Sequence, residues 1–137
     1  MAVTLVDSNI LLDLATGDPT WQDWSEAALD YSNRSGDLVI NAVIYSEVSA
    51  AFHRIEDADQ LMDQRRFRRE DVPWAAAFLA AQAFRHYRRK GGIRTAMLPD
   101  FLIAAHATLL GYTLLTRDRA RFVSYFPALR IMSPADH

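Results

Sequence analysis

The chain has no cysteine, and this absence restricts the sites that it can form. Disulfide bonds and thiolate metal sites, which need cysteine sulfur, are excluded. Any metal ion must therefore be held by oxygen or imidazole groups, which the 17 acidic residues and 4 histidines can supply.

Long apolar runs are also missing. No hydrophobic segment approaches the roughly 20 residues that span a bilayer, and the N-terminus lacks a basic segment followed by an apolar stretch and a cleavage site. We therefore expect a cytoplasmic protein with no membrane partner. The 137 residues, half of them hydrophobic, suit one ordinary domain, so we expect residues 1–137 to form a single domain.

Lysine is nearly absent, and the charges are unevenly distributed. Residues 1–63 hold 12 acidic and 2 basic residues, a net charge of −10, whereas residues 64–137 hold 5 acidic and 13 basic residues, a net charge of +8. Nine basic residues lie between positions 65 and 94, and all except Lys90 are arginine, which suits bidentate phosphate contacts. Two interpretations stay open: a solvated charged surface, or a patch that follows a phosphate backbone.

The first apolar run ends at a carboxylate. Residues 4–6 resemble a strand buried on both faces of a parallel sheet, which places Asp7 at the carboxyl end of that strand. Open α/β sheets bind ligands at this edge. Taken alone, however, Asp7 is better explained as a helix N-cap or turn residue, because aspartate favours both positions.

The rest of the pattern predicts alternating helices and strands. Apolar spacing and end signals indicate helices at residues 21–34, 41–54, 58–67, 74–90, 97–110 and 119–125. Short apolar or β-branched runs indicate strands at 38–40, 112–116 and 128–132, and a weaker one at 68–72. The helix over 74–90 has Trp74, Phe78 and Phe84 in register, with arginines on its polar side. Such alternation indicates βαβ units and therefore an α/β fold.

Glu47 lies on or at the border of the apolar face of the predicted helix 41–54. An unpaired carboxylate there would cost several kcal/mol, so Glu47 needs a partner, a proton or a cation. The alternative is a glutamate at the edge of the helix that reaches solvent.

Two more acids occupy the start of a helix and the end of a strand. Asp100 lies in the first turn of the nearly apolar helix 97–110, where the helix dipole alone would favour an acid. Asp118 follows the strand 112–116 in the way that Asp7 follows the first strand. His106 projects elsewhere on its helix, and we expect a core or interface histidine rather than a ligand.

The conjunction of Asp7, Glu47, Asp100 and Asp118 says more than any one of them. Carboxylates brought together repel one another, and some protonate unless a cation joins them. Oxygen ligands select hard ions such as Mg²⁺ or Mn²⁺, which commonly bind through carboxylates plus substrate phosphate. The set therefore predicts metal-assisted hydrolysis of a phosphodiester.

Four segments in order, V-D-S-N-I-L-L-D, S-E-V, P-D-F-L-I-A-A-H-A and L-L-T-R-D, resemble the PIN domain, and in particular the VapC-type toxins of bacterial toxin-antitoxin pairs. The resemblance covers essentially the whole chain. It implies a three-layer α/β/α sandwich with a central parallel sheet. It also implies a Mg²⁺- or Mn²⁺-dependent endoribonuclease that cleaves RNA, is usually a homodimer and is inhibited by a cognate VapB-type antitoxin. The family roles carry over to Asp7, Glu47, Asp100 and Asp118 as the acidic metal site.

Supporting roles follow from the same resemblance. Ser8, Asn9 and Thr116 are expected to support the acids by hydrogen bonding. The basic side chains expected to guide the RNA backbone are Arg85, Arg88, Arg89, Arg117 and Arg119.

One departure from the family pattern is visible in the sequence. Many relatives carry a further polar or acidic residue ahead of a phenylalanine, whereas here Ala120 and Arg121 precede Phe122. We therefore expect neither a fifth ligand nor a second tightly held ion. Asp13 receives no role, because it lies on the first helix away from Asp7.

Two other functions compete with the nuclease. A PIN-like fold could bind RNA or a partner protein without catalysis, although retention of all four acids argues against it. A receiver-type phosphoacceptor domain has a similar length and an aspartate after its first strand. It would also need an acidic pair beside that aspartate and a lysine after a late strand, yet Asp7 has no acidic neighbour and Lys90 lies at a helix end.

Overall fold

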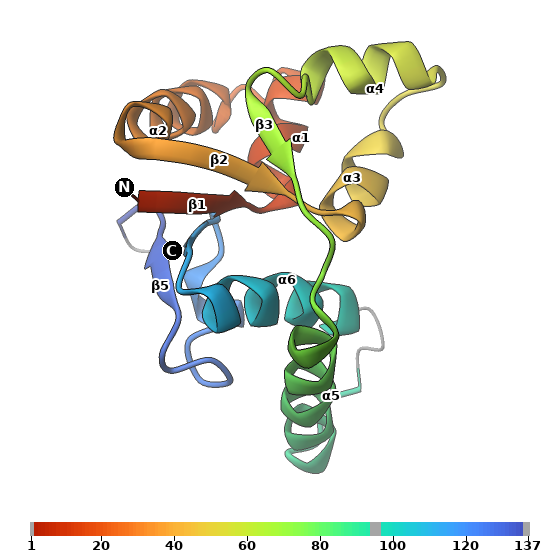
Figure 1. The fold of residues 1–137 in the computed structure, drawn as a ribbon, viewed down its shortest axis with the longest axis vertical. Helices are drawn as coiled ribbons and strands as arrows, with labels where there is room; N and C mark the ends of the chain where they lie inside the picture. Colours follow the sequence, from red (N-terminus) through yellow and green to blue (C-terminus); the bar gives the residue numbers. More distant parts are fainter. Residues whose placement is uncertain (1, 94–96, 136–137) are drawn as a thin grey trace.

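The structure, a computed structural model, describes residues 2–93 and 97–135 (Figure 1). Arg94, the last member of the basic cluster, lies outside the described residues. Among the described helices, none is long and apolar enough to cross a bilayer.

Five parallel strands form the centre of the molecule. They are β1 (Ala2–Val6), β2 (Gly36–Ile40), β3 (Phe67–Arg69), β4 (Thr113–Leu115) and β5 (Arg130–Met132), in the spatial order β3-β2-β1-β4-β5. Leu5 pairs with Val39 on one side and Leu114 on the other, and all three are fully buried. The strand order reverses between β1 and β4, and ligands bind at such a switch point in open α/β sheets.

Helices cover both faces of the sheet (Figure 1). One face is covered by α1 (Ser8–Thr16) and α2 (Gln22–Ser35), and the other by α6 (Met97–Leu110). The helix α5 (Trp74–Arg89) packs on α6 and extends away from the sheet. The remaining helices, α3 (Ala42–Ser49) and α4 (Ile55–Leu61), connect β2 to β3. The predicted three-layer α/β/α sandwich with a central parallel sheet is confirmed.

Gly36 allows α2 to run directly into β2. It pairs with Ala2 of β1, and a Cβ atom at position 36 would lie 1.6 Å from the carbonyl oxygen of Ala2. No larger residue fits this approach, so the glycine is needed for β2 to begin beside β1.

Several predicted elements are shorter or displaced. The helix over 41–54 ends at Ser49, the helix over 58–67 lies at Ile55–Leu61, and the strand over 68–72 lies at Phe67–Arg69. Asp63 explains the second displacement, since its carboxylate accepts from the Arg65 backbone N–H at 2.9 Å and its carbonyl accepts from Phe67 at 2.8 Å. The resulting turn separates α4 from β3. The helix over 119–125 is only a 3₁₀ turn, η1 (Arg119–Arg121).

The helix over 74–90 forms as α5, but part of its expected core face is exposed. The side toward the core consists of small residues, Ala76, Ala80 and Ala83. Trp74 is 92% exposed and Phe78 is 68% exposed, so these two in-register aromatics lie outside the core. Phe84 does pack inward, with its ring 6.4 Å from that of Phe101 in α6.

Candidate active site

Asp7 lies at the switch point of the sheet and is almost completely buried, with 1% exposure. Its backbone N–H donates to the Leu115 carbonyl at 2.9 Å, and its Oδ1 caps α1 by accepting from the Ser8 backbone N–H at 2.8 Å. Its Oδ2 accepts from the Thr116 hydroxyl at 2.8 Å. Burial raises the pKa of Asp7, while the hydrogen bonds from Thr116 and Ser8 oppose that rise. Asp7 is therefore an N-cap and also a carboxylate at the ligand-binding edge.

The expected supporting residues form one hydrogen-bond network around Asp7. Thr116 Oγ1 accepts from the Asp118 backbone N–H at 3.1 Å and from Asn9 Nδ2 at 3.3 Å. Asn9 Oδ1 accepts from the Arg117 backbone N–H at 3.3 Å. These contacts connect the start of α1 to the loop after β4.

Glu47 on α3 and Asp100 on α6 lie close enough to Asp7 for their charges to affect one another. Burial raises the pKa of Glu47, Ser8 opposes this by hydrogen bonding, and the charge of Asp7 raises it further. Glu47 Oε1 is buried and has no hydrogen-bond partner among the described residues. Burial raises the pKa of Asp100 to about 6, Arg121 opposes the rise, and the charges of Asp7 and Glu47 add to it. Each of these three carboxylates therefore affects, or is affected by, the charge of another.

Arg121 connects Asp118 to this group. Its Nη2 and Nε lie 2.8 Å and 3.1 Å from Asp118 Oδ2, and its Nη1 lies 3.1 Å from Asp100 Oδ2. Burial lowers the pKa of Arg121, but Asp100, Asp118 and Asp7 together raise it above the ordinary value. The sequence analysis assigned no role to Arg121. Its position ahead of Phe122, where many relatives carry a polar or acidic residue, was the feature that could have pointed to it.

The donor set suits a hard divalent cation. All four candidate ligands are carboxylates, the type that Mg²⁺ and Mn²⁺ prefer, and Glu47 Oε1 is a buried acceptor without a partner. Within residues 2–93 and 97–135, however, no three Asp, Glu or His side chains are already arranged as a metal-binding group. The side chain of Asp118 is 41% exposed and is paired with Arg121.

Asp13, which received no role from the sequence, holds Arg117. Asp13 is buried and accepts from Ser25 Oγ at 2.6 Å and from Arg117 Nε at 2.8 Å. The Arg117 guanidinium also lies over the Trp21 ring, 5.2 Å from its centroid. The charge of Arg117 is thus balanced within the protein.

The arginines near the end of α5 are arranged differently. Arg85, Arg88 and Arg89 are exposed, and none forms an ion pair with a described residue. A pocket of about 370 Å³ lies between α5 and the loop after β4, and its lining includes Tyr87, Asp118 and Arg121. Tyr87, near the end of α5, therefore lies beside Asp118 and Arg121. Arg119 of η1 is exposed and contacts the Ile131 carbonyl at 3.2 Å.

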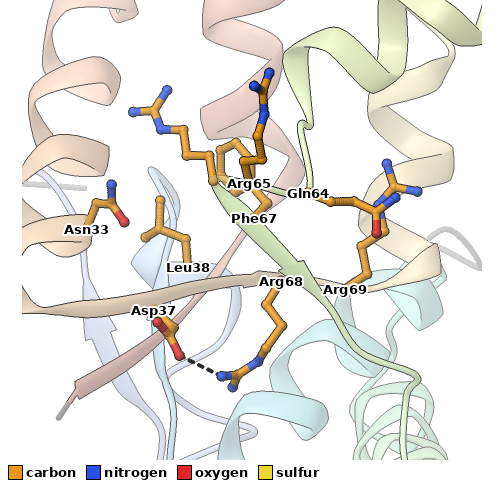
Figure 2. Close-up of a pocket in the computed structure, with 9 residues that line it drawn as sticks. Asn33, Asp37, Leu38, Gln64, Arg65, Phe67, Arg68 and Arg69 are labelled. Carbon is orange, nitrogen blue, oxygen red and sulfur yellow. Dashed lines mark hydrogen bonds and ion pairs between the residues drawn. The ribbon is translucent and has the colours of Figure 1, made fainter.

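A second arginine-rich pocket, of about 460 Å³, lies beside β3 (Figure 2). Its arginines are paired: Arg68 lies 2.6 Å from Asp37, and the others that pair with acids are Arg65 with Asp63, Arg66 with Asp30 and Arg69 with Asp59. Asp37 is near the start of β2, whereas Asp7 follows the end of β1. Because the two strands are parallel, Asp37 and Asp7 lie at opposite ends of the sheet. This half of the basic cluster fits the interpretation of a solvated charged surface.

Comparison with known proteins agrees with this fold. The toxin-antitoxin complex from Klebsiella pneumoniae has a chain that is 22% identical, with a TM-score of 0.72 and coverage of 98% of this chain and 99% of that one. A chain of VapBC2 from Rickettsia felis, bound to a promoter DNA fragment, is 19% identical with a TM-score of 0.72, and the match covers 96% of this chain and 98% of that one. A chain of DNA-bound VapBC from Salmonella typhimurium is 20% identical with a TM-score of 0.71, and the match covers 97% of this chain and 98% of that one.

A comparison with curated protein sequences gives no match. The PIN domain matches residues 4–125, which is most of the chain and includes Asp7, Glu47, Asp100 and Asp118. By this match, and with the parallel sheet described above, the chain belongs to the PIN domain family.

Proposed function

We propose that the chain is a divalent-metal-dependent endoribonuclease and the toxin of a type II toxin-antitoxin pair. The observation that carries the proposal is the convergence of Asp7, Glu47 and Asp100, from three separate segments, at the carboxyl edge of the sheet. Burial raises the pKa of each of these carboxyl groups, and a buried oxygen of Glu47 has no partner among the described residues. Membership of the PIN domain family supports a nuclease.

The residues proposed to hold Mg²⁺ or Mn²⁺ are Asp7, Glu47, Asp100 and Asp118. When bound, such an ion lowers the pKa of coordinated water and offsets charge on the scissile phosphate. Thr116 and Ser8 fix the Asp7 carboxylate by hydrogen bonds to its two oxygens, so that its orientation does not depend on the ion.

RNA is proposed to approach along the end of α5. Arg85, Arg88 and Arg89 are exposed on the same end of α5 as Tyr87, which lines the pocket with Asp118 and Arg121, and they can pair with backbone phosphates in the way that arginine favours. The chain has no such unpaired group at β3, where each of the described arginines is paired with an acid.

The proposed partners are a cognate VapB-type antitoxin and a second copy of the chain. The solved structures with a similar fold include VapBC complexes, which supports an antitoxin partner. The homodimer follows from the family resemblance.

Of the competing functions, the receiver-type domain is not supported. Receiver domains have the strand order 2-1-3-4-5, whereas this sheet has the order β3-β2-β1-β4-β5. Lys90 follows α5 rather than a strand. A catalytically silent module that binds RNA or protein remains the alternative that experiment must separate.

The decisive variant is Asp7→Asn, which keeps the shape and the capping ability of the side chain but removes its charge. We expect RNA cleavage to fall by about a hundredfold or more, and growth arrest to be lost, because a metal-binding carboxylate is removed from the centre of the site. Asp23→Asn, at an exposed position of α2, is the matched control.

Calorimetric titration with Mn²⁺ separates the nuclease from the silent module. The nuclease requires Mn²⁺ binding that weakens in Asp7→Asn and in Asp100→Asn. If Asp7→Asn cleaves RNA and arrests growth as well as the parent protein does, the assignment of the site is wrong.

A further inference from the structure

Arg121 places a fixed positive charge among the carboxylates of the candidate metal site. Its guanidinium contacts oxygens from two elements, Asp100 Oδ2 on α6 at 3.1 Å and Asp118 Oδ2 after β4 at 2.8 Å. Its charge also reaches Asp7 and Glu47, whose pKa values it lowers against the effect of burial. One side chain thus interacts with all four acids.

We propose that the Arg121 guanidinium is a built-in counter-cation, which stabilises the metal-free crevice and must leave Asp100 and Asp118 before their carboxylates bind a divalent cation. This inference rests on the metal-dependent function proposed above. It assigns to Arg121 a competition with the ion rather than a contact with substrate.

The competition follows from the geometry of the contacts. A guanidinium at 2.8–3.1 Å uses the same carboxylate oxygens that Mg²⁺ needs at about 2.1 Å in a near-octahedral arrangement. Two cations that share these oxygens repel each other, so binding of the ion and pairing with the guanidinium disfavour one another. The pairing also agrees with the finding that, among the described side chains, no three acids or histidines are arranged as a metal-binding group.

Space for the displaced side chain is present next to the site. Arg121 already lines the pocket of about 370 Å³ that also includes Tyr87 and Tyr125. This pocket gives the guanidinium a place to go when it leaves Asp100.

A purely structural ion pair would behave differently from a counter-cation. Loss of a structural pair lowers stability and leaves metal affinity unchanged or lower. Loss of a competing cation lowers the stability of the metal-free protein and raises metal affinity. Metal affinity therefore distinguishes the two roles.

The first experiment measures Mn²⁺ binding by calorimetry for the wild-type protein and for Arg121→Gln. We expect Arg121→Gln to bind Mn²⁺ about tenfold more tightly or better, because the carboxylates lose a cation within a few ångströms. In EDTA we expect its melting temperature to fall below that of the wild type, and added Mn²⁺ to restore more stability to the variant than to the wild type.

Arg68→Gln is the matched control. Arg68 also bridges two carboxylates, Asp37 at 2.6 Å and Glu70 at 2.9 Å, but it lies on β3, away from the four acids. It changes the net charge by the same amount. Its Mn²⁺ affinity should stay within about twofold of the wild type, since Arg68 pairs with none of the four acids and salt screens its exposed charge.

The second experiment follows displacement directly in the wild-type protein. The side-chain Nε–H signal of Arg121, identified by its absence from the spectrum of Arg121→Lys, is monitored by NMR during titration with Mg²⁺. We expect this signal to shift or to exchange with water faster as Mg²⁺ binds, while the Arg68 signal stays unchanged. Because only the wild-type protein is titrated, the result does not depend on how well a variant folds.

The outcomes separate this inference from the proposed function. If the wild type binds Mn²⁺ but Arg121→Gln binds it no more tightly, or if the Arg121 signal is unmoved at saturating Mg²⁺, the counter-cation is overturned and the nuclease proposal stands. If neither protein binds Mn²⁺, both are overturned.

Discussion

Asp100 illustrates how burial and neighbouring charge set the protonation of one carboxyl group. Burial is the main cause that raises its pKa from 3.8 to about 6. The charge of Arg121 opposes this rise, and the negative charges of Asp7 and Glu47 add to it. The folded, metal-free protein therefore keeps this carboxyl group protonated to a higher pH than the unfolded chain does. A group in this state is one that a cation would stabilise.

The raised pKa of Asp100 predicts a pH dependence of stability in EDTA. Between pH 3.8 and about 6 the folded state binds more protons than the unfolded state, so the free energy of unfolding falls as pH rises through this window. Asp100→Asn lacks this dependence. Relative to the wild type, we expect its free energy of unfolding to increase by about 1–2 kcal/mol from pH 4.5 to pH 7. The full effect would be about 1.4 kcal/mol for each unit of difference in pKa, and it is reduced because water partly screens the carboxyl group.

Urea unfolding at both pH values measures this difference, with Asp23→Asn as the control at an exposed position. Parallel pH profiles for Asp100→Asn and the wild type would contradict the prediction.

At the level of elements, the start of α3 fixes the position of Glu47. Asn41 Oδ1 accepts from the Ile44 backbone N–H at 3.0 Å, and Asn41 Nδ2 lies 3.0 Å from His106 Nδ1. His106 is completely buried, as expected for a core histidine. Burial lowers its pKa although Glu70 opposes this, so the neutral ring can accept the amide proton of Asn41.

Asn41→Ala should destabilise the protein by about 2 kcal/mol. The change removes an N-cap, which is worth about 1 kcal/mol, and leaves a buried ring nitrogen without its donor, which costs about 1 kcal/mol or more. Thermal and urea unfolding give the measurement. Asn41→Ser is the matched control, because a serine keeps the capping oxygen and loses only the amide donor, so it should cost less than Asn41→Ala. Equal stability of Asn41→Ala and the wild type would refute the role of the cap.

At the level of the whole molecule, the two halves of the basic cluster have different surroundings. The arginines around β3 pair with acids from the acidic first half of the chain, including Asp30, Asp37 and Asp59. The arginines at the end of α5 form no ion pair with a described residue, and they lie on the same turns of the helix as Tyr87, which lines the pocket with Asp118 and Arg121. Only the second group has no acid of the described chain as a partner.

Replacing the three α5 arginines with glutamine should weaken RNA binding and its salt dependence. The changes are Arg85→Gln, Arg88→Gln and Arg89→Gln together. For a single-stranded RNA in EDTA, we expect the slope of log K against log salt to become less steep by about 2, because each lost phosphate contact removes about 0.7. Fluorescence anisotropy at several salt concentrations gives the slope.

The matched control replaces three paired arginines of the β3 region, Arg65, Arg66 and Arg69, with glutamine. It changes the net charge equally, but these arginines are paired with acids, so a slope close to that of the wild type is expected. If both triple variants lose the same slope, net charge rather than the α5 surface governs RNA binding.

The sequence by itself determined the strands, the order of the helices and the residues offered as metal ligands. Short aliphatic runs such as the one around Leu5 are stable only when both faces are covered, and this requirement is local enough to be read from the pattern. The positions of Asp7 and Asp118 after strands, and of Asp100 in the first turn of a helix, follow from the same boundaries.

Only the tertiary structure decided which helix faces are buried and which charges meet. In α2 the aromatic Tyr31 is 57% exposed, whereas the small polar Ser25 is completely buried beside Leu29. In α5 alanines face the core and Trp74 faces outward. The pairing of Arg121 with Asp100 joins residues 21 positions apart in the sequence. Periodicity reports only neighbours along one element, while burial and ion pairing depend on what the rest of the chain places opposite.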